Sequence, residues 1–263
     1  MKNNSKPGIA LAILGILVGL LLAYQIASIY QSTIDGKITG RRPDEAITVQ
    51  VVFAILGWLT LAAASLMGVS LYGFANKLEW GWFWGTVAAT IYMLTAFFPI
   101  IPPASVGLPS PTAPTFGLAA VIWFGMLLLG GVDKKIIALA FVAGLAYVLT
   151  YMDGVADISR YQTVPDPLSH GIYAVTQMVN WWGAAAWAVF IFSLLRRKTW
   201  VVPLGVFAAM MSMLGGFPLG ITDVIRLGRF SMFLPAPLIS TGLLVYLLLP
   251  STRRMIEAWN ARE

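Results

Sequence analysis

The chain has 263 residues, of which only 11% are charged, whereas a soluble domain carries about 25%. Hydrophobic residues make up 59% of it, and the mean hydropathy is +0.81. The polar side chains are too few to cover a water-soluble globule of this size. The composition therefore excludes a soluble enzyme. The absence of cysteine excludes disulfides, thiolate metal sites and thiol catalysis.

Long uncharged stretches predict membrane-spanning helices, because about 20 mostly apolar residues cross the hydrocarbon core of a bilayer. These stretches lack the alternating pattern of barrel strands. The Pro-rich segment 99–114 divides the longest of them into two. We therefore expect an all-α integral membrane protein with eight transmembrane helices, near residues 7–31, 46–75, 80–101, 115–132, 134–152, 170–195, 200–222 and 230–250.

The distribution of Lys and Arg predicts the orientation of these helices. With eight spans, both termini lie on one side, and eleven of the 17 cations fall there against six on the other. Short loops rich in Lys and Arg favour the cytoplasm, so we expect both termini to be cytoplasmic. The inner cations are Lys2, Lys6, Lys77, Lys134, Lys135, Arg196, Arg197, Lys198, Arg253, Arg254 and Arg262; the outer ones are Lys37, Arg41, Arg42, Arg160, Arg226 and Arg229.

A weak internal repeat relates the two halves of the chain. The tripeptide Leu-Ala-Tyr at Leu22 recurs at Leu145, and the dipeptide Asp-Gly at Asp35 recurs at Asp153. A constant shift of 120 residues also carries Trp80, Gly85, Ala88, Ala89, Met93, Leu94 and Phe97 onto Trp200, Gly205, Ala208, Ala209, Met213, Leu214 and Phe217. Because each copy would hold four helices, we expect two tandem four-helix repeats, residues 1–132 and 133–263. A pseudo-twofold axis along the membrane normal would relate them.

The repeat suggests a polar site in the outer half of the membrane. It is formed by Tyr24 and Gln50 from the first repeat and by Tyr147, Gln177 and Asn180 from the second. Amide groups are costly in hydrocarbon unless they are paired, so these side chains should face the protein interior. They could line a pocket between the repeats for a neutral or lipophilic molecule such as a quinone or a lipid. Alternatively, they are hydrogen-bonding residues that hold helices together.

Asp223 and Arg226 form a second candidate site. Their i, i+3 spacing allows an ion pair on one face of a helix, and Pro218 should break or kink that helix just before them. Transporters often build substrate sites beside broken helices. The same two residues could instead mark a solvated helix end.

The predicted outer loops 32–45 and 153–169 hold six of the 11 acidic residues, namely Asp35, Asp44, Glu45, Asp153, Asp157 and Asp166. No carboxylate is therefore expected deep in the membrane, which argues against a proton or sodium relay. The single histidine, His170, excludes bis-histidine haem within this chain, and we expect Ser169 to cap the helix that follows. We predict no metal and no cofactor, although a bound lipid or quinone fits the composition.

Three functions remain open from the sequence. The first is a non-catalytic membrane subunit of a larger complex. The second is a carrier or binding protein for a neutral or lipophilic small molecule, and the third is a membrane enzyme acting on a lipid or quinol. The expected partners are the lipid bilayer and either other membrane subunits or further copies of this chain. Nucleic acid is not expected, because no basic patch is interleaved with aromatic residues.

The segment Ser251–Glu263 should form an interfacial helix whose apolar side chains, among them Ile256 and Trp259, enter the lipid.

Overall fold

The structure is a computed structural model that describes residues 5–40, 43–164 and 166–261. The chain is 87% helical, and the described residues contain no strand, which confirms the expected all-helical class. Four of the cations used to predict orientation, Lys2, Arg41, Arg42 and Arg262, lie outside the described residues. The helices are α1 (Ser5–Thr39), α2 (Pro43–Ala75), α3 (Trp80–Phe97), η1 (Phe98–Ile100), α4 (Ile101–Ala104), α5 (Thr112–Leu129), α6 (Lys134–Thr163), α7 (Pro167–Leu195), α8 (Val201–Leu227), α9 (Pro235–Leu248) and α10 (Pro250–Asn260).

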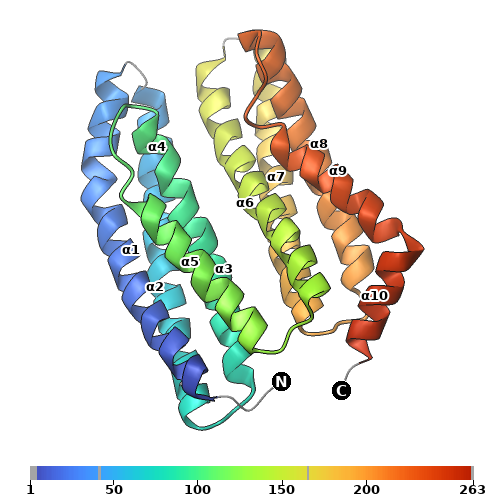
Figure 1. The fold of residues 1–263 in the computed structure, drawn as a ribbon. Helices are drawn as coiled ribbons and strands as arrows, with labels where there is room; N and C mark the ends of the chain where they lie inside the picture. Colours follow the sequence, from blue (N-terminus) through green and yellow to red (C-terminus); the bar gives the residue numbers. More distant parts are fainter. Residues whose placement is uncertain (1–4, 41–42, 165, 262–263) are drawn as a thin grey trace. The chain divides into compact units, whose positions relative to one another are not determined.

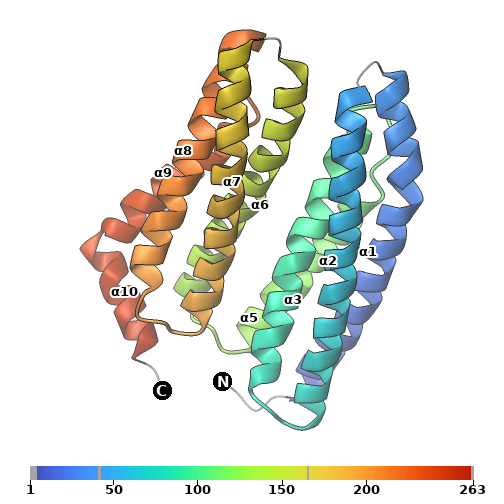
Figure 2. The same cartoon turned by 180° about the vertical axis from the view of Figure 1, so that it is seen from behind.

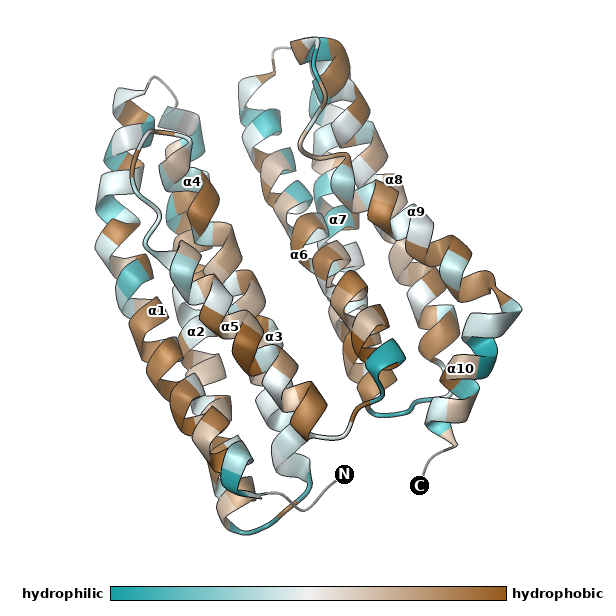
Figure 3. Cartoon of the chain, in the orientation of Figure 1, coloured by the Kyte–Doolittle hydropathy of each residue, from teal (hydrophilic) through white to brown (hydrophobic). Residues whose placement is uncertain are grey.

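Seven of the described helices are long and apolar enough to cross a membrane. An eighth span exists if α9 and α10, which meet at an angle of 76°, count as one broken span. The described residues therefore form a helical, apolar, multi-pass membrane protein with seven or eight helices of sufficient length to span the bilayer. Figure 3 shows hydrophobic residues along much of the helices, and such residues suit contact with lipid.

The chain divides into two compact units, Met1–Asp133 and Lys134–Glu263, which we call the first and second units. In the first unit α1 packs on α2, α2 on α3, α3 on α5 and α5 back on α1. In the second unit α6, α7, α8 and α9 pack in the same order (Figures 1 and 2). Antiparallel four-helix arrangements commonly pair neighbours in this way, so the proposed duplication stays a prediction.

The most important difference from the predicted boundaries is the length of α6. The sequence predicted that this helix ends at residue 152 and that Asp153 and Asp157 lie in an outer loop, but α6 continues to Thr163 and buries both. The prediction was wrong because it ended the helix at its first carboxylate, Asp153. Both carboxylates instead lie on the face of α6 that packs inside the second unit. Helix α7 supplies hydrogen-bond donors to Asp157 there.

Helix α8 is continuous through Pro218 as far as Leu227, so the helix is not broken before Asp223. The alternative expectation, a kink at Pro218, stays a prediction. The helix ends at Gly228, whose φ of 63° is the left-handed conformation that glycine adopts most readily at this position. The continuous helix turns Asp223 toward the interior of the second unit, where its side chain is buried.

Candidate functional site

Four buried polar side chains meet inside the second unit. Asp153 and Asp157 lie one turn apart on α6, and we call them the acidic pair. Thr176 and Asn180 lie one turn apart on the neighbouring helix α7. The exposed fractions are 2% for Asp153 and zero for Asp157 and Asn180. The acidic pair lies in the half of α6 nearer Thr163, because Asp153 is about 28 Å of helix beyond Lys134.

The Asp157 carboxylate is held by two hydrogen bonds from α7. The Thr176 hydroxyl donates to Oδ1 at 2.8 Å, and the Asn180 amide donates through Nδ2 to Oδ2 at 2.8 Å. Hydrogen bonds to a charged acceptor are the stronger kind, and here one falls on each oxygen. Asp157 therefore joins α6 to α7 and has a fixed orientation.

Two buried oxygen atoms beside it have no hydrogen-bond partner among the described residues. They are Oδ2 of Asp153 and Oδ1 of Asn180. Both lie against consecutive glycines of α8: a Cβ at Gly216 would stand 3.1 Å from the Asp153 oxygen, and one at Gly215 would overlap the Asn180 amide. The lack of side chains at these two positions makes room for the polar atoms. Unpaired buried oxygens are costly, so this part of the site is suited to an additional hydrogen-bond donor or a cation.

A hydroxyl cluster lies on the side of the acidic pair nearer the start of α6. The Thr150 and Ser212 hydroxyl oxygens are 2.6 Å apart, and the Trp187 indole donates to Ser212 Oγ at 3.1 Å. All three side chains are fully buried. This cluster joins α6, α7 and α8. The large Trp187 side chain forms the boundary of the polar region on that side.

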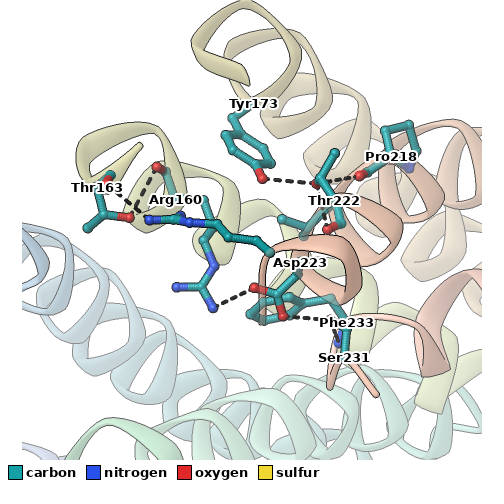
Figure 4. A network of polar contacts seen from close by, with 10 residues as sticks. Arg160, Thr163, Tyr173, Pro218, Thr222, Asp223, Ser231 and Phe233 are labelled. Atoms are coloured by element: carbon teal, nitrogen blue, oxygen red, sulfur yellow. Dashed lines mark hydrogen bonds and ion pairs between the residues drawn. The ribbon is translucent and has the colours of Figure 1, made fainter. Parts of the chain in front are cut away.

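An interhelical ion pair lies on the opposite side, and Figure 4 shows it. The Arg160 guanidinium on α6 is 2.9 Å from Oδ1 of Asp223 on α8. The Ser231 hydroxyl donates to Oδ2 of the same carboxylate at 2.9 Å and accepts the Phe233 backbone N–H at 3.2 Å. The guanidinium also lies 5.4 Å from the centre of the Phe233 ring. Asp223 thus connects α6, α8 and the segment before α9.

The pair predicted from the sequence, Asp223 with Arg226, does not form. Asp223 faces α6, where Arg160 supplies the cation, whereas Arg226 is exposed and donates to the backbone carbonyl of Thr163 at 3.3 Å. That carbonyl belongs to the last turn of α6, where helix carbonyls lack partners within the helix. Arg226 therefore supplies a hydrogen-bond donor to the C-terminal end of α6.

Two of the other predicted site residues belong to the first unit and lie on its surface: Tyr24 is 71% exposed and Gln50 is also exposed. In the second unit, Tyr147 and Gln177 are half-buried, while Asn180 is fully buried beside Asp157. Of the predicted residues, Asn180 and Asp223 are the ones that contribute to the buried polar network described above. The pocket predicted between the repeats stays a prediction.

Sequence reasoning missed the acidic pair, Thr176, Arg160 and Ser231. One signal was available: Asp153, Asp157 and Arg160 are spaced i, i+4 and i+7, which places them on one face of a continued helix. No local pattern pointed to Ser231, whose role depends on how the chain returns from α8 to α9.

The start of α7 also differs from its prediction. Its N-cap is Asp166, followed by Pro167, and the Asp166 carboxylate accepts the backbone N–H of Ser169 at 2.8 Å. Ser169 had been expected to be the cap. The hydrogen bond from the Ser169 backbone lowers the pKa of Asp166 below its ordinary value of 3.8.

The chemistry of the site is that of oxygen ligands and proton-binding groups. Within the described ranges, no three His, Cys, Asp or Glu residues are grouped so as to hold a metal ion. Comparisons with protein-family models, curated proteins and solved structures find no match to this chain.

Proposed function

We propose that this protein is a membrane carrier that binds a proton at the acidic pair during its transport cycle. The observation that carries the proposal is the full burial of Asp153 and Asp157 one turn apart, with one Asp153 oxygen unpartnered. Ionisable residues inside membrane helices are costly and commonly belong to ion or proton pathways. The substrate class carried over from the sequence is a neutral or lipophilic small molecule.

The energetic argument favours a proton. Two ionised carboxylates in one buried site repel each other and lose their hydration. A proton on Asp153 removes one of the charges and supplies a donor for an acceptor such as the unpartnered Asn180 oxygen. A sodium ion would need several more oxygen ligands, whereas both oxygens of Asp157 already accept hydrogen bonds from Thr176 and Asn180.

The neighbouring groups fit a carrier mechanism. The Arg160–Asp223 ion pair lies on one side of the acidic pair and the Trp187 cluster on the other. Opening of the ion pair would give water access to Asp157, which is three residues before Arg160 on α6. Alternate opening on the two sides is the usual requirement for coupled transport.

Infrared spectroscopy of the full chain in lipid nanodiscs tests proton binding directly. We expect a pH-dependent absorption band of a protonated carboxylic acid that is lost in Asp153→Asn. The matched control is Asp35→Asn, which changes an exposed aspartate of the first unit that is followed, like Asp153, by glycine. A spectrum that responds to sodium instead of pH would assign the site to sodium. If the spectrum responds to neither pH nor sodium, the acidic pair has a structural role only, and the proposal of a proton site is wrong.

Transport is tested in proteoliposomes that contain a pH-sensitive dye. A panel of neutral and lipophilic compounds is added outside the vesicles under an imposed membrane potential. A carrier of the proposed kind acidifies the lumen with at least one compound, and Asp153→Asn abolishes this response while Asp35→Asn retains it. A response that survives in Asp153→Asn would contradict the assignment of the acidic pair.

A non-catalytic membrane subunit is the second candidate. The observation that favours it is an exposed apolar stripe on α7, formed by Val175, Met178, Trp182 and Val189. Lipid or a partner helix could cover this stripe. Native mass spectrometry after purification in mild detergent separates the two, since a subunit retains a second protein. The orientation with both termini in the cytoplasm belongs to the same proposal and is tested by labelling of cysteines introduced at the exposed positions Lys6 and Thr39.

A further inference from the structure

A cavity of about 530 Å³ lies at the start of α8, where α10 turns back on the second unit. Its walls are mostly apolar and include Val202, Val206, Leu248 and Ile256. Its volume lies within the range of roughly 300–1,000 Å³ typical of small-molecule sites. The acidic pair lies farther along the helices, so this cavity is separate from the proposed proton site.

The cavity is held in shape by the way α10 is attached. The Trp259 indole donates to the Leu194 carbonyl at 2.8 Å, and the Arg197 guanidinium lies 4.5 Å from the centre of the Trp259 ring. Ile256 and Trp259 are therefore buried against the protein. The expectation that they enter the lipid was wrong, because the 76° bend before α10 turns its apolar face toward α7 and α8.

The cavity lies at a depth that lipid can reach. Helix α9 has 14 residues, which corresponds to about 21 Å of helix. The hydrocarbon core is about 30 Å thick. Because α9 is about 9 Å shorter than that core, a helix α9 that begins at one membrane surface ends within reach of the acyl chains below the other surface. The exposed Trp200, beside the cavity, is typical of this boundary.

Two opposite charges line the cavity one helical turn apart. They are Arg253 and Glu257 on α10. In the part of the chain that the structure describes, no side-chain hydrogen bond or ion pair involves either of them. A free guanidinium suits a phosphate group, and a free carboxylate suits a primary ammonium group. An ethanolamine phospholipid carries both groups on one short headgroup.

We infer that this cavity binds a phospholipid of the phosphatidylethanolamine type. Its phosphate contacts Arg253, its ammonium contacts Glu257, and part of one acyl chain fills the apolar space beside Val206. Arg253 is positive and would meet the negative phosphate, whereas Glu257 is negative and would meet the positive ammonium group. The two protein charges are one helical turn apart, and the two headgroup charges are likewise neighbours. Choline has no N–H to donate to Glu257, and a glycerol headgroup donates only a neutral hydroxyl without the positive charge of the ammonium.

Native mass spectrometry of the full chain tests this with defined lipids. Retention of phosphatidylethanolamine, phosphatidylglycerol and phosphatidylcholine is measured in competition. We expect the ethanolamine lipid to be retained preferentially. Glu257→Gln should lower its retention about tenfold while leaving the glycerol lipid unchanged or better bound, and Arg253→Gln should lower retention of both about tenfold.

Arg254→Gln is the matched control for the arginine, because Arg254 is the next residue on the same helix, is exposed and does not line the cavity. Equal effects of Arg253→Gln and Arg254→Gln would mean general attraction to charged lipid and would overturn the site. An unchanged lipid preference in Glu257→Gln would overturn the headgroup assignment.

Val206→Trp tests the acyl chain, since it fills the cavity. Val189→Trp adds the same side chain to an exposed position of α7. The first should abolish preferential retention and the second should not. If Val206→Trp fails to fold by circular dichroism and gel filtration, the charge variants still decide the proposal. A dimer that dissociates on Val206→Trp would assign the cavity to a second copy of the chain.

Discussion

Asp35 in the first unit and Asp153 in the second are both followed by glycine, and the sequence pattern paired them. Their environments are nevertheless opposite. Asp35 is exposed and accepts a hydrogen bond from the Gln31 amide on its own helix at 2.9 Å. Asp153 is 2% exposed, and one of its oxygens has no hydrogen-bond partner within the described chain. The same dipeptide is therefore a surface feature in one unit and part of a buried site in the other.

The difference arises from the helices around each aspartate. In the second unit, Gly215 and Gly216 on α8 leave space for polar atoms from α6 and α7. In the first unit, the core is filled by Phe53, Met67 and other large apolar residues. Among its described buried residues there is no carboxylate. Two units with the same order of helix packing thus differ in the polarity of their interiors through the size and polarity of a few core residues.

The largest expected effect is that of Gly215→Ala. The new Cβ would overlap the Asn180 amide, so the hydrogen bond to Asp157 would be lost along with the local packing. We expect a loss of about 3 kcal/mol in the free energy of unfolding, from overpacking plus a lost charge-assisted hydrogen bond. Unfolding in mixed detergent, with hydrogen exchange of α7 and α8 to locate the loss, measures it.

Gly117→Ala in the first unit is the control for this change, because nothing lies within 4 Å of the added methyl group. It should stabilise α5 by up to about 1 kcal/mol through helix propensity. If both alanines had the same effect, the polar site would not depend on the space beside Gly215, and the contrast between the units would fail.

The next effect is that of Thr176→Val, which removes one of the two donors to Asp157 without changing the side-chain volume greatly. We expect a loss of about 2 kcal/mol, because a buried carboxylate oxygen loses its partner. Thr60→Val in the first unit is the counterpart: Thr60 is buried on α2 and donates to the Leu56 carbonyl of its own helix. That change should cost less than about 1 kcal/mol in the same unfolding measurement.

The ion pair between Arg160 and Asp223 should contribute less. A double-mutant cycle with Arg160→Gln and Asp223→Asn should give a coupling free energy of about 1 kcal/mol, since Arg160 is 24% exposed and water screens the pair. A second cycle that combines Asp223→Asn with Arg226→Gln should give no coupling. Coupling in the second cycle and none in the first would favour the pairing predicted from the sequence.

The smallest effect concerns the cap of α7. Because the pKa of Asp166 is lowered in the folded protein, its contribution to stability is complete above the unfolded value near 3.8 and disappears as the pH falls through the folded pKa. Asp166→Asn keeps a capping side chain but removes this pH dependence. Helices α3 and α5 of the first unit begin without a side-chain cap. Stability measured by unfolding between about pH 2 and 5 should therefore change at α7 alone among these three helix starts. A pH profile that stays the same in Asp166→Asn would contradict this.

The sequence allowed the helical class and the approximate position of each apolar helix to be predicted, because hydropathy follows directly from composition. It also identified Asn180, since an amide in an apolar segment must find a partner. It could not locate the acidic pair. Charge alone suggested a loop, whereas the helix continues and places Asp153 and Asp157 on its inner face.

What the sequence determined by itself is therefore a membrane protein of long apolar helices with few charges. The tertiary structure decided which charges are buried and what they contact. Asp157 is satisfied by residues 19 and 23 positions later in the chain, and Asp223 by an arginine from α6. Whether a polar group is buried depends on the side chains that face it from other helices, and those are set by packing between distant segments.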